Sequence, residues 1–221
     1  MVGNRIVVVC TANMIRSPFI AGLIRSRVQT FTGCGLEVES AGTAARPGIG
    51  AAPETIDLGK TYGLDLSGHR TRRLDEGVLA TGDTVLCAER AHRRVVLDLR
   101  PDLLSRVFTV REFARLLAHG PVRDAAGDWE GLVRAAGRAR LSGRVMPEED
   151  DDVVDPVGRA QEVWTAFERE ATQAVSAILA AVGALPPEGS AASSSPLPPA
   201  TRREYRTRLA ALSSRRAARR G

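Results

Sequence analysis

Short apolar runs alternate with amphipathic segments along most of the chain. The run Arg5–Cys10 (RIVVVC) is apolar at consecutive positions, which is typical of a strand buried on both faces of a sheet. The sequence predicts four strands, at Arg5–Cys10, Leu36–Ala41, Thr84–Cys87 and Arg106–Thr109. Apolar residues spaced by three and four predict helices between and after these runs. The first helix is expected to have Ser17 at its cap and Pro18 at its first position. The others are expected at Pro53–Tyr62, Arg90–Leu99, Val110–Leu117, Trp129–Arg140 and Arg159–Val182.

This alternation of strands and helices is typical of an α/β fold with a parallel sheet. We therefore expect a single domain over residues 1–183, with a four-stranded parallel sheet in the order 2-1-3-4 flanked by helices. After residue 183 the sequence turns to Pro, Ser and Ala (LPPEGSAASSSPLPPA), a composition that cannot bury a core. Residues 184–221 are predicted to be a disordered linker followed by an Arg-rich tail.

The basic net charge of +5 belongs to this tail rather than to the predicted domain. Residues 184–221 contain eight Arg against two Glu, which leaves the domain with a net charge of −1. Tyr205, Leu209 and Leu212 fall on one helical face among the arginines, so the tail is a candidate for contact with an anionic surface. The alternative is a solvated, disordered tail.

Several protein classes are excluded by what the sequence lacks. No run of eighteen apolar residues is present, and the N-terminus does not have the pattern of a signal peptide, so a cytoplasmic protein is expected. Cys10, Cys34 and Cys87 are then expected to be free thiols. They form no C-x-x-C pair and the three histidines are scattered, so we expect neither a metal nor a cofactor.

The segment Cys10–Pro18 (CTANMIRSP) carries the candidate chemistry. It places a cysteine at the carboxyl end of a buried strand and Arg16 at a helix N-terminus, and ligands bind at this edge of open α/β sheets. The N–H groups of the five residues between them can converge on one tetrahedral oxyanion, to which Arg16 adds a bidentate contact. The same field favours the thiolate form of Cys10, which is the nucleophile. An isolated C-x5-R pattern occurs by chance, with the cysteine as a buried apolar residue, but here strand, loop and helix start agree.

At these residues the sequence resembles the low-molecular-weight protein tyrosine phosphatase family, whose signature is V-C-x-G-N-x-C-R-S-P near the N-terminus. Three further segments match that family in order along the chain, from Arg5 to Val182. They are Ser40–Thr43 (SAGT), Gly63–His69 (GLDLSGH) followed by Arg70, and Asp155–Pro156 before the last helix.

The resemblance implies a role for each matching residue. Cys10 would attack phosphorus and form a phosphocysteine, Arg16 would hold the phosphoryl oxygens, and Asp155 would act as general acid and then as general base. The resemblance also implies that Ser17 hydrogen-bonds the Cys10 sulfur and that Asn13, with Ser40 and His69, holds the loop. The loop residues expected to surround the phosphate are Thr11, Ala12, Asn13, Met14 and Ile15, together with Ser17. The expected substrate is a phosphorylated protein, with phosphotyrosine favoured, or a small aryl phosphate.

The sequence also departs from the family. Ala12 stands where Gly is usual, and Ile15 replaces the second loop cysteine that can form a protective disulfide with the nucleophile. The aromatic residues that usually flank the crevice are missing at Ala44–Pro47 and Val157–Gly158, which weakens the case for phosphotyrosine. Met14 is long and apolar where family members acting on phosphoarginine tend to have Thr, which favours an aryl phosphate. Arg46 would favour acidic peptides if it lined the mouth of the site.

Two other functions remain open. Thioredoxin-coupled arsenate reductases share this fold and loop, and Cys87 lies in a matching region, but the third cysteine expected seven residues later is Arg94. The other alternative is a non-catalytic phosphate-binding module, which is kept open because Ala12 replaces the Gly that is usual in the loop.

Two groups of polar residues are assigned to the surface. His92 and His119 are expected on helix surfaces. The acidic run Glu148–Asp152 is expected to be a solvated loop rather than a cation site.

Overall fold

The computed structural model describes residues 4–28, 35–119, 122, 128–142 and 151–185. Its sheet contains β1 (Arg5–Cys10), β2 (Glu37–Gly42), β3 (Thr84–Cys87) and β4 (Val107–Thr109). The strands are parallel and lie in the order β2-β1-β3-β4, which confirms the predicted fold class and strand order. Because β1 is central, Val9 is paired with Ala41 on one side and with Cys87 on the other. The carboxyl ends of β1, β2 and β3 therefore lie at one edge of the sheet.

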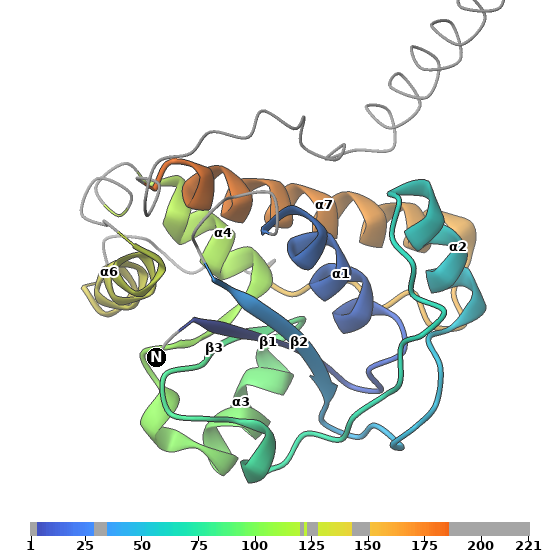
Figure 1. The fold of residues 1–221 in the computed structure, drawn as a ribbon, viewed down its shortest axis with the longest axis horizontal. Helices are drawn as coiled ribbons and strands as arrows, with labels where there is room; N and C mark the ends of the chain where they lie inside the picture. Colours follow the sequence, from blue (N-terminus) through green and yellow to red (C-terminus); the bar gives the residue numbers. More distant parts are fainter. Residues whose placement is uncertain (1–3, 29–34, 120–121, 123–127, 143–150, 186–221) are drawn as a thin grey trace, which may run out of the picture.

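The helices cover both faces of this sheet (Figure 1). Alternate residues of β1 point to opposite sides, since Ile6 and Val8 belong to one apolar cluster whereas Val7 and Val9 belong to another. The helices are α1 (Arg16–Val28), α2 (Pro53–Thr61), α3 (Arg90–Leu99), α4 (Val110–Ala118), α6 (Trp129–Leu141) and α7 (Gln161–Gly183). The first cluster includes residues of α1, α4, α6 and α7, and the second includes Val96 of α3. Short 3-10 turns lie at Glu76–Val78 and Pro101–Leu103.

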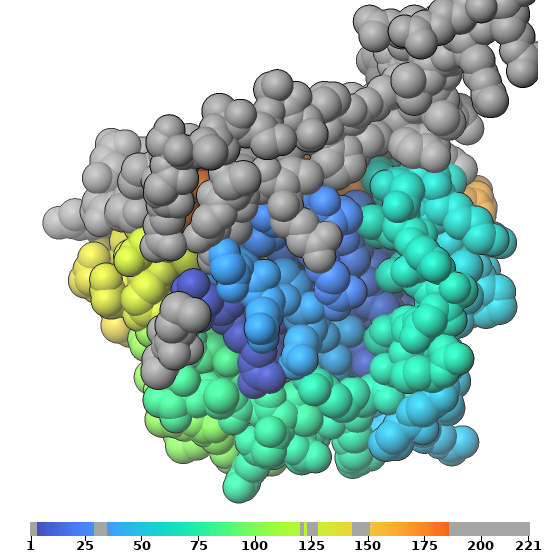
Figure 2. Space-filling view, in the orientation of Figure 1, coloured from blue at the N-terminus to red at the C-terminus, as the bar shows by residue number. Residues whose placement is uncertain are grey.

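The segments between β2 and β3 close the β2 side of the molecule. In the space-filling view, the light-blue to teal residues from β2 through α2 to the turn at Glu76–Val78 form the right-hand and lower parts of the face shown (Figure 2). Gly42, at the end of β2, allows this layer to approach the loop that follows β1. A Cβ atom at Gly42 would lie 2.6 Å from the carbonyl oxygen of Thr11 and 2.8 Å from the backbone nitrogen of Asn13, so a larger residue would displace the loop.

The predicted start of the first helix is wrong. Helix α1 begins at Arg16, so Ser17 lies inside its first turn and Pro18 follows as the third helical residue. Proline is tolerated there because the N–H groups of the first turn have no partner within the helix. The Ser17 hydroxyl does not cap the helix but faces Cys10 and Asn13. The ends of the other predicted elements differ from the observed ones by at most two residues, as is usual at frayed ends, and those of β1, β3 and α3 agree.

The expectation of a solvated acidic loop is wrong for Asp151, whereas Asp152 keeps a partly exposed side chain. Asp151 is 5% exposed and accepts hydrogen bonds of 2.8 and 2.9 Å from Arg115 of α4. Asp152 accepts a 2.7 Å hydrogen bond from the backbone N–H of Arg90, at the first turn of α3. These contacts attach the segment that leads to Asp155 to two helices. Glu148, Glu149 and Asp150 lie outside the described residues.

The predicted linker and tail lie almost wholly outside the described residues, which end at Leu185. Helix α7 ends at Gly183, where the composition changes. Among the helices of the described part of the chain, none combines the length and apolar character needed to cross a bilayer.

Candidate active site

The loop between β1 and α1 curls around the sulfur of Cys10. Cys10 ends β1 and is 3% exposed, and five residues separate it from Arg16 at the start of α1. Asn13 has a φ of +57°, a left-handed conformation that turns the chain back toward the helix. The backbone of the loop is fixed to the segment after β2, because Thr43 and Ala44 donate 2.9 Å hydrogen bonds to the carbonyls of Cys10 and Thr11.

Asn13 is fully buried and uses its whole amide group. Its Nδ2 donates hydrogen bonds of 2.9 Å to Ser17 Oγ and to Ser40 Oγ, and its Oδ1 accepts one of 2.9 Å from the backbone N–H of Arg72. The left-handed conformation costs about 1–2 kcal/mol in a residue with a Cβ atom. Three hydrogen bonds at about 1 kcal/mol each offset that cost.

His69 holds the same turn from outside. Its Nε2 lies 2.7 Å from the carbonyl oxygen of Asn13 and donates to it. Burial lowers the pKa of His69, against the opposing effect of the Asn13 carbonyl, so the neutral ring is favoured. The structure thus brings Asn13, Ser40 and His69 into one set of contacts around the loop.

Ser17 connects this set of contacts to the sulfur. Its Oγ lies 3.0 Å from Cys10 Sγ and 3.3 Å from the carbonyl oxygen of Ala41. Because Oγ accepts a hydrogen bond from Asn13, its own proton remains available, and the sulfur is the nearer acceptor.

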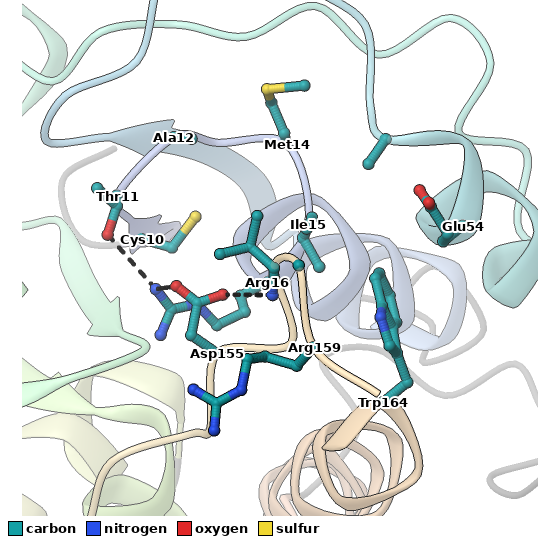
Figure 3. Close-up of a pocket in the computed structure, with 13 residues that line it drawn as sticks. Cys10, Thr11, Ala12, Met14, Ile15, Arg16, Glu54, Asp155, Arg159 and Trp164 are labelled. Carbon is teal, nitrogen blue, oxygen red and sulfur yellow. Dashed lines mark hydrogen bonds and ion pairs between the residues drawn. The ribbon is translucent and has the colours of Figure 1, made fainter. Parts of the chain in front are cut away.

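Arg16 joins the loop to two other segments and is 2% exposed (Figure 3). Its Nη1 forms an ion pair with Glu89 and donates a 3.2 Å hydrogen bond to the carbonyl of Val153. Its Nη2 donates a 2.7 Å hydrogen bond to Asp155 Oδ2 and lies 3.4 Å from Thr11 Oγ1. Arg16 therefore brings Asp155, which is distant in the sequence, to the loop of Cys10.

His92 is not the surface residue that the sequence predicts, since it is 4% exposed and His119 alone of the pair is exposed. The backbone N–H of Glu89 donates a 3.1 Å hydrogen bond to His92 Nδ1, which caps α3. His92 Nε2 lies 2.8 Å from Thr11 Oγ1. Glu89 and His92 were missed as site residues, although they follow β3, whose carboxyl end adjoins that of β1.

A pocket of about 350 Å³ opens above Cys10. Its lining includes most of the predicted site residues, whereas Asn13 and Ser17 are buried beneath it and Arg46 is not among its lining residues. Trp164, from the first turn of α7, gives the pocket an aromatic wall (Figure 3), although the sequence has no aromatic residue at Ala44–Pro47 or Val157–Gly158. The lining residues are Cys10, Thr11, Ala12, Met14, Ile15, Arg16, Ala52, Glu54, Asp155, Val157, Gly158, Arg159 and Trp164.

Trp164 is held in place by the core. It is partly buried and packs edge-on against Phe167, with 6.1 Å between the ring centroids.

No cluster of three or more His, Cys, Asp or Glu side chains suited to a metal ion is found among the residues that the structure describes.

Comparison with known proteins assigns the chain to a protein family. The profile of the family described as low molecular weight phosphotyrosine protein phosphatase matches residues 5–127, more than half of the chain. The chain therefore belongs to this family of phosphatases.

The similar proteins include curated relatives and solved structures. The chain is 32% identical over 104 residues to the low molecular weight protein-tyrosine-phosphatase Wzb of Escherichia coli K12, which covers 47% of this chain and 67% of Wzb. It is 30% identical over 118 residues to the probable low molecular weight protein-tyrosine-phosphatase EpsP of Ralstonia solanacearum, which covers 53% of this chain and 78% of EpsP.

Two solved structures resemble this fold over 80% of the chain. The low molecular weight protein tyrosine phosphatase of T. tengcongensis has a TM-score of 0.58 at 28% identity, covering 80% of this chain and 97% of that protein. The YwlE arginine phosphatase of Geobacillus stearothermophilus has a TM-score of 0.56 at 25% identity, covering 80% and 91%.

Proposed function

We propose that this protein hydrolyses phosphate monoesters through a phosphocysteine intermediate and that its substrates are phosphotyrosine residues of proteins or other aryl phosphates. The observation that carries the proposal is the meeting of three groups in one pocket. The sulfur of Cys10, the guanidinium of Arg16 and the carboxylate of Asp155 all line it, although Asp155 comes from a segment far along the chain.

The hydrolysis proceeds in two chemical steps, in which Cys10 and Asp155 take part directly. The Cys10 thiolate donates an electron pair to phosphorus, the bond from phosphorus to the ester oxygen breaks, and protonated Asp155 gives its proton to that oxygen. In the second step, the Asp155 carboxylate takes a proton from water. The water oxygen then bonds to phosphorus, the phosphorus–sulfur bond breaks, and inorganic phosphate leaves as the thiolate is restored.

Arg16 is suited to hold the phosphoryl group through both steps. It is buried and lines the pocket, and a planar guanidinium binds two phosphoryl oxygens at once. In the structure Nη2 contacts Asp155 Oδ2 at 2.7 Å. A phosphoryl group bound to Arg16 would take over that contact and leave Asp155 directed at the ester oxygen.

The shape and lining of the pocket support an aryl substrate. Cys10 is 3% exposed at its base, so the phosphorus must be carried on a stem long enough to reach it. Trp164, Met14 and Val157 are apolar residues that line the pocket, against which a phenyl ring can be buried.

The structure weakens the case for an arsenate reductase. Cys87 is fully buried and belongs to the apolar cluster with Val7 and Val9, on the face of the sheet that α3 covers. Burial raises the pKa of its thiol far above the usual range, which opposes thiolate chemistry. A disulfide relay would have to use this thiol, with Arg94 where a third one is expected.

The test is release of phosphate from para-nitrophenyl phosphate and from a phosphotyrosine peptide. Cys10→Ser is expected to abolish both activities, and Cys87→Ala, the matched cysteine control, to preserve them. Asp155→Ala is expected to slow turnover while phosphate still binds, and phosphorylated Cys10 should then be detected by mass spectrometry after rapid acid quench. Arsenate reduction without phosphatase activity, or full activity of Cys10→Ser, would contradict the proposal.

A further inference from the structure

The hydroxyl of Thr11 lies at the edge of the pocket between two donors. Thr11 follows Cys10 directly, is exposed and lines the pocket. Its Oγ1 is 2.8 Å from His92 Nε2 and 3.4 Å from Arg16 Nη2 (Figure 3 shows the latter contact). The direction of the first of these hydrogen bonds decides what the hydroxyl can offer to a ligand.

The protonation of His92 is fixed by its other nitrogen. Nδ1 accepts the backbone N–H of Glu89 at 3.1 Å, so Nδ1 carries no proton and, in a neutral ring, Nε2 must carry one. Burial also lowers the pKa of His92 and favours the neutral ring, with Arg16 acting in the same direction and Glu89, Asp155 and Asp152 opposing it. His92 Nε2 therefore donates to Thr11 Oγ1.

This direction leaves the proton of the Thr11 hydroxyl for another acceptor. A hydroxyl has two lone pairs and one proton, and its lone pairs face His92 and Arg16, both of which are donors. In the part of the chain that the structure describes, no acceptor for this proton is found. Since Thr11 lines the pocket, an oxygen of a phosphoryl group bound there is placed to accept a hydrogen bond from this hydroxyl.

We propose that the Thr11 hydroxyl donates a hydrogen bond to the phosphoryl group and that His92 is a positioning residue that fixes the direction of this hydrogen bond. The proposal rests on the proposed function in so far as it places a phosphoryl group in the pocket. It adds a side-chain donor to the backbone N–H groups of the loop and to Arg16. It also gives the buried His92 a role that acts through Thr11 alone.

The test measures binding of inorganic phosphate to the Cys10→Ser protein by isothermal titration calorimetry, so that catalysis is not needed. Thr11→Val removes the hydroxyl at nearly constant shape and is expected to weaken phosphate binding about tenfold, as for one hydrogen bond to a charged group. Thr11→Ser retains the hydroxyl and is expected to bind phosphate like the parent. Unchanged phosphate binding by Thr11→Val overturns the proposal.

The role of His92 is tested by a double-mutant cycle in the same background. His92→Asn leaves an acceptor near the Glu89 N–H but is too short to reach Thr11, and it is expected to weaken phosphate binding about fivefold. In the Thr11→Val background the same substitution is expected to cause no further loss. Additive losses overturn the positioning role, because a general structural effect of His92 would not depend on the Thr11 hydroxyl.

The outcome can be separated from that of the proposed function. If the unmodified protein hydrolyses no phosphate ester while Cys10→Ser binds phosphate in a Thr11-dependent way, the proposed reaction fails and the binding contact stands. If hydrolysis depends on Cys10 but the affinity for phosphate does not change on substitution of Thr11, the proposed reaction stands and this inference fails. Thermal unfolding of each variant shows whether it folds, and Thr11→Ala replaces Thr11→Val if that variant does not.

Discussion

The two sides of the loop after β1 are held by different kinds of contact. On one side, which we call the pinned side, neutral side chains surround the turn at Asn13. On the other, the charged side, the contacts of Arg16 are largely with ionised groups. The pinned side consists of Asn13, Ser17, Ser40 and His69, and the charged side of Thr11, Arg16, Glu89, His92 and Asp155.

The difference indicates that the side chains of the pinned side keep their partners within the protein, whereas those of the charged side exchange partners when a substrate binds. On the pinned side, the side-chain amide of Asn13 makes three hydrogen bonds within the protein, so this side chain is not directed at a substrate. On the charged side, Arg16 and Asp155 contact each other and both line the pocket. A phosphoryl group would compete for Arg16. Substitutions on the charged side should therefore affect activity more than stability, and those on the pinned side stability more than activity.

The largest effect is expected from Arg16→Lys. Lysine keeps the charge but cannot bind two oxygens in one plane, so transition-state stabilisation by the charged side is lost. We expect kcat/KM for para-nitrophenyl phosphate to fall by about 10²–10³-fold. Arg94→Lys, on the exposed surface of α3, is the matched control and should retain the parent activity. Similar kcat/KM values for the two variants would remove the distinction between the sides.

The next effect is expected on the pinned side, from Asn13→Ala. Alanine loses three hydrogen bonds and must still adopt a φ of +57°, so the free energy of unfolding should fall by about 3 kcal/mol. Asn13→Gly loses the same hydrogen bonds without the conformational cost and should be about 1 kcal/mol more stable than Asn13→Ala. Urea denaturation measures both. Equal stability of the two variants would show that the left-handed turn carries no cost here.

A smaller effect is expected from Trp164→Leu, which removes the aromatic wall and keeps an apolar side chain. The kcat/KM for a phosphotyrosine peptide should fall about fivefold, whereas that for an alkyl phosphate should not change. Trp164→Phe should restore most of the loss. If Trp164→Leu lowers both activities by the same factor, Trp164 supports the fold and does not select the substrate.

The fold was largely predictable from local patterns, whereas the pinned side, which joins distant segments, was predictable only through the family resemblance. Consecutive apolar residues marked β1, and the resemblance at Asn13 marked the turn. The error at Ser17 has a local cause too, since the sequence shows that a serine precedes a proline but not that its hydroxyl faces a sulfur.

The charged side and the pocket wall depend on contacts between distant segments. Nothing near His92 in the sequence indicates that it lies against Thr11, and nothing near Trp164 indicates that it lines the pocket as well as packing against the core. The useful signal was topological. Residues that follow neighbouring parallel strands meet at one edge, so the Glu89–His92 turn after β3 had to adjoin the loop after β1.

The smallest expected effect concerns pH and involves one histidine from each side. Burial lowers the pKa of both His69 and His92 below the ordinary value of 6.5. At a pH between the lowered pKa of the folded protein and 6.5, the unfolded chain therefore binds more protons than the folded protein. The contribution of both rings to stability is then complete above about pH 6.5 and is lost as the pH falls through their lowered pKa values. Urea denaturation at several pH values between about 5 and about 8 should show the free energy of unfolding decreasing toward acid. The His92→Asn variant should show a shallower decrease, because one of the two rings is gone. A decrease as steep as in the parent would mean that His92 is not held neutral, and the direction of its hydrogen bond to Thr11 would then be lost with it.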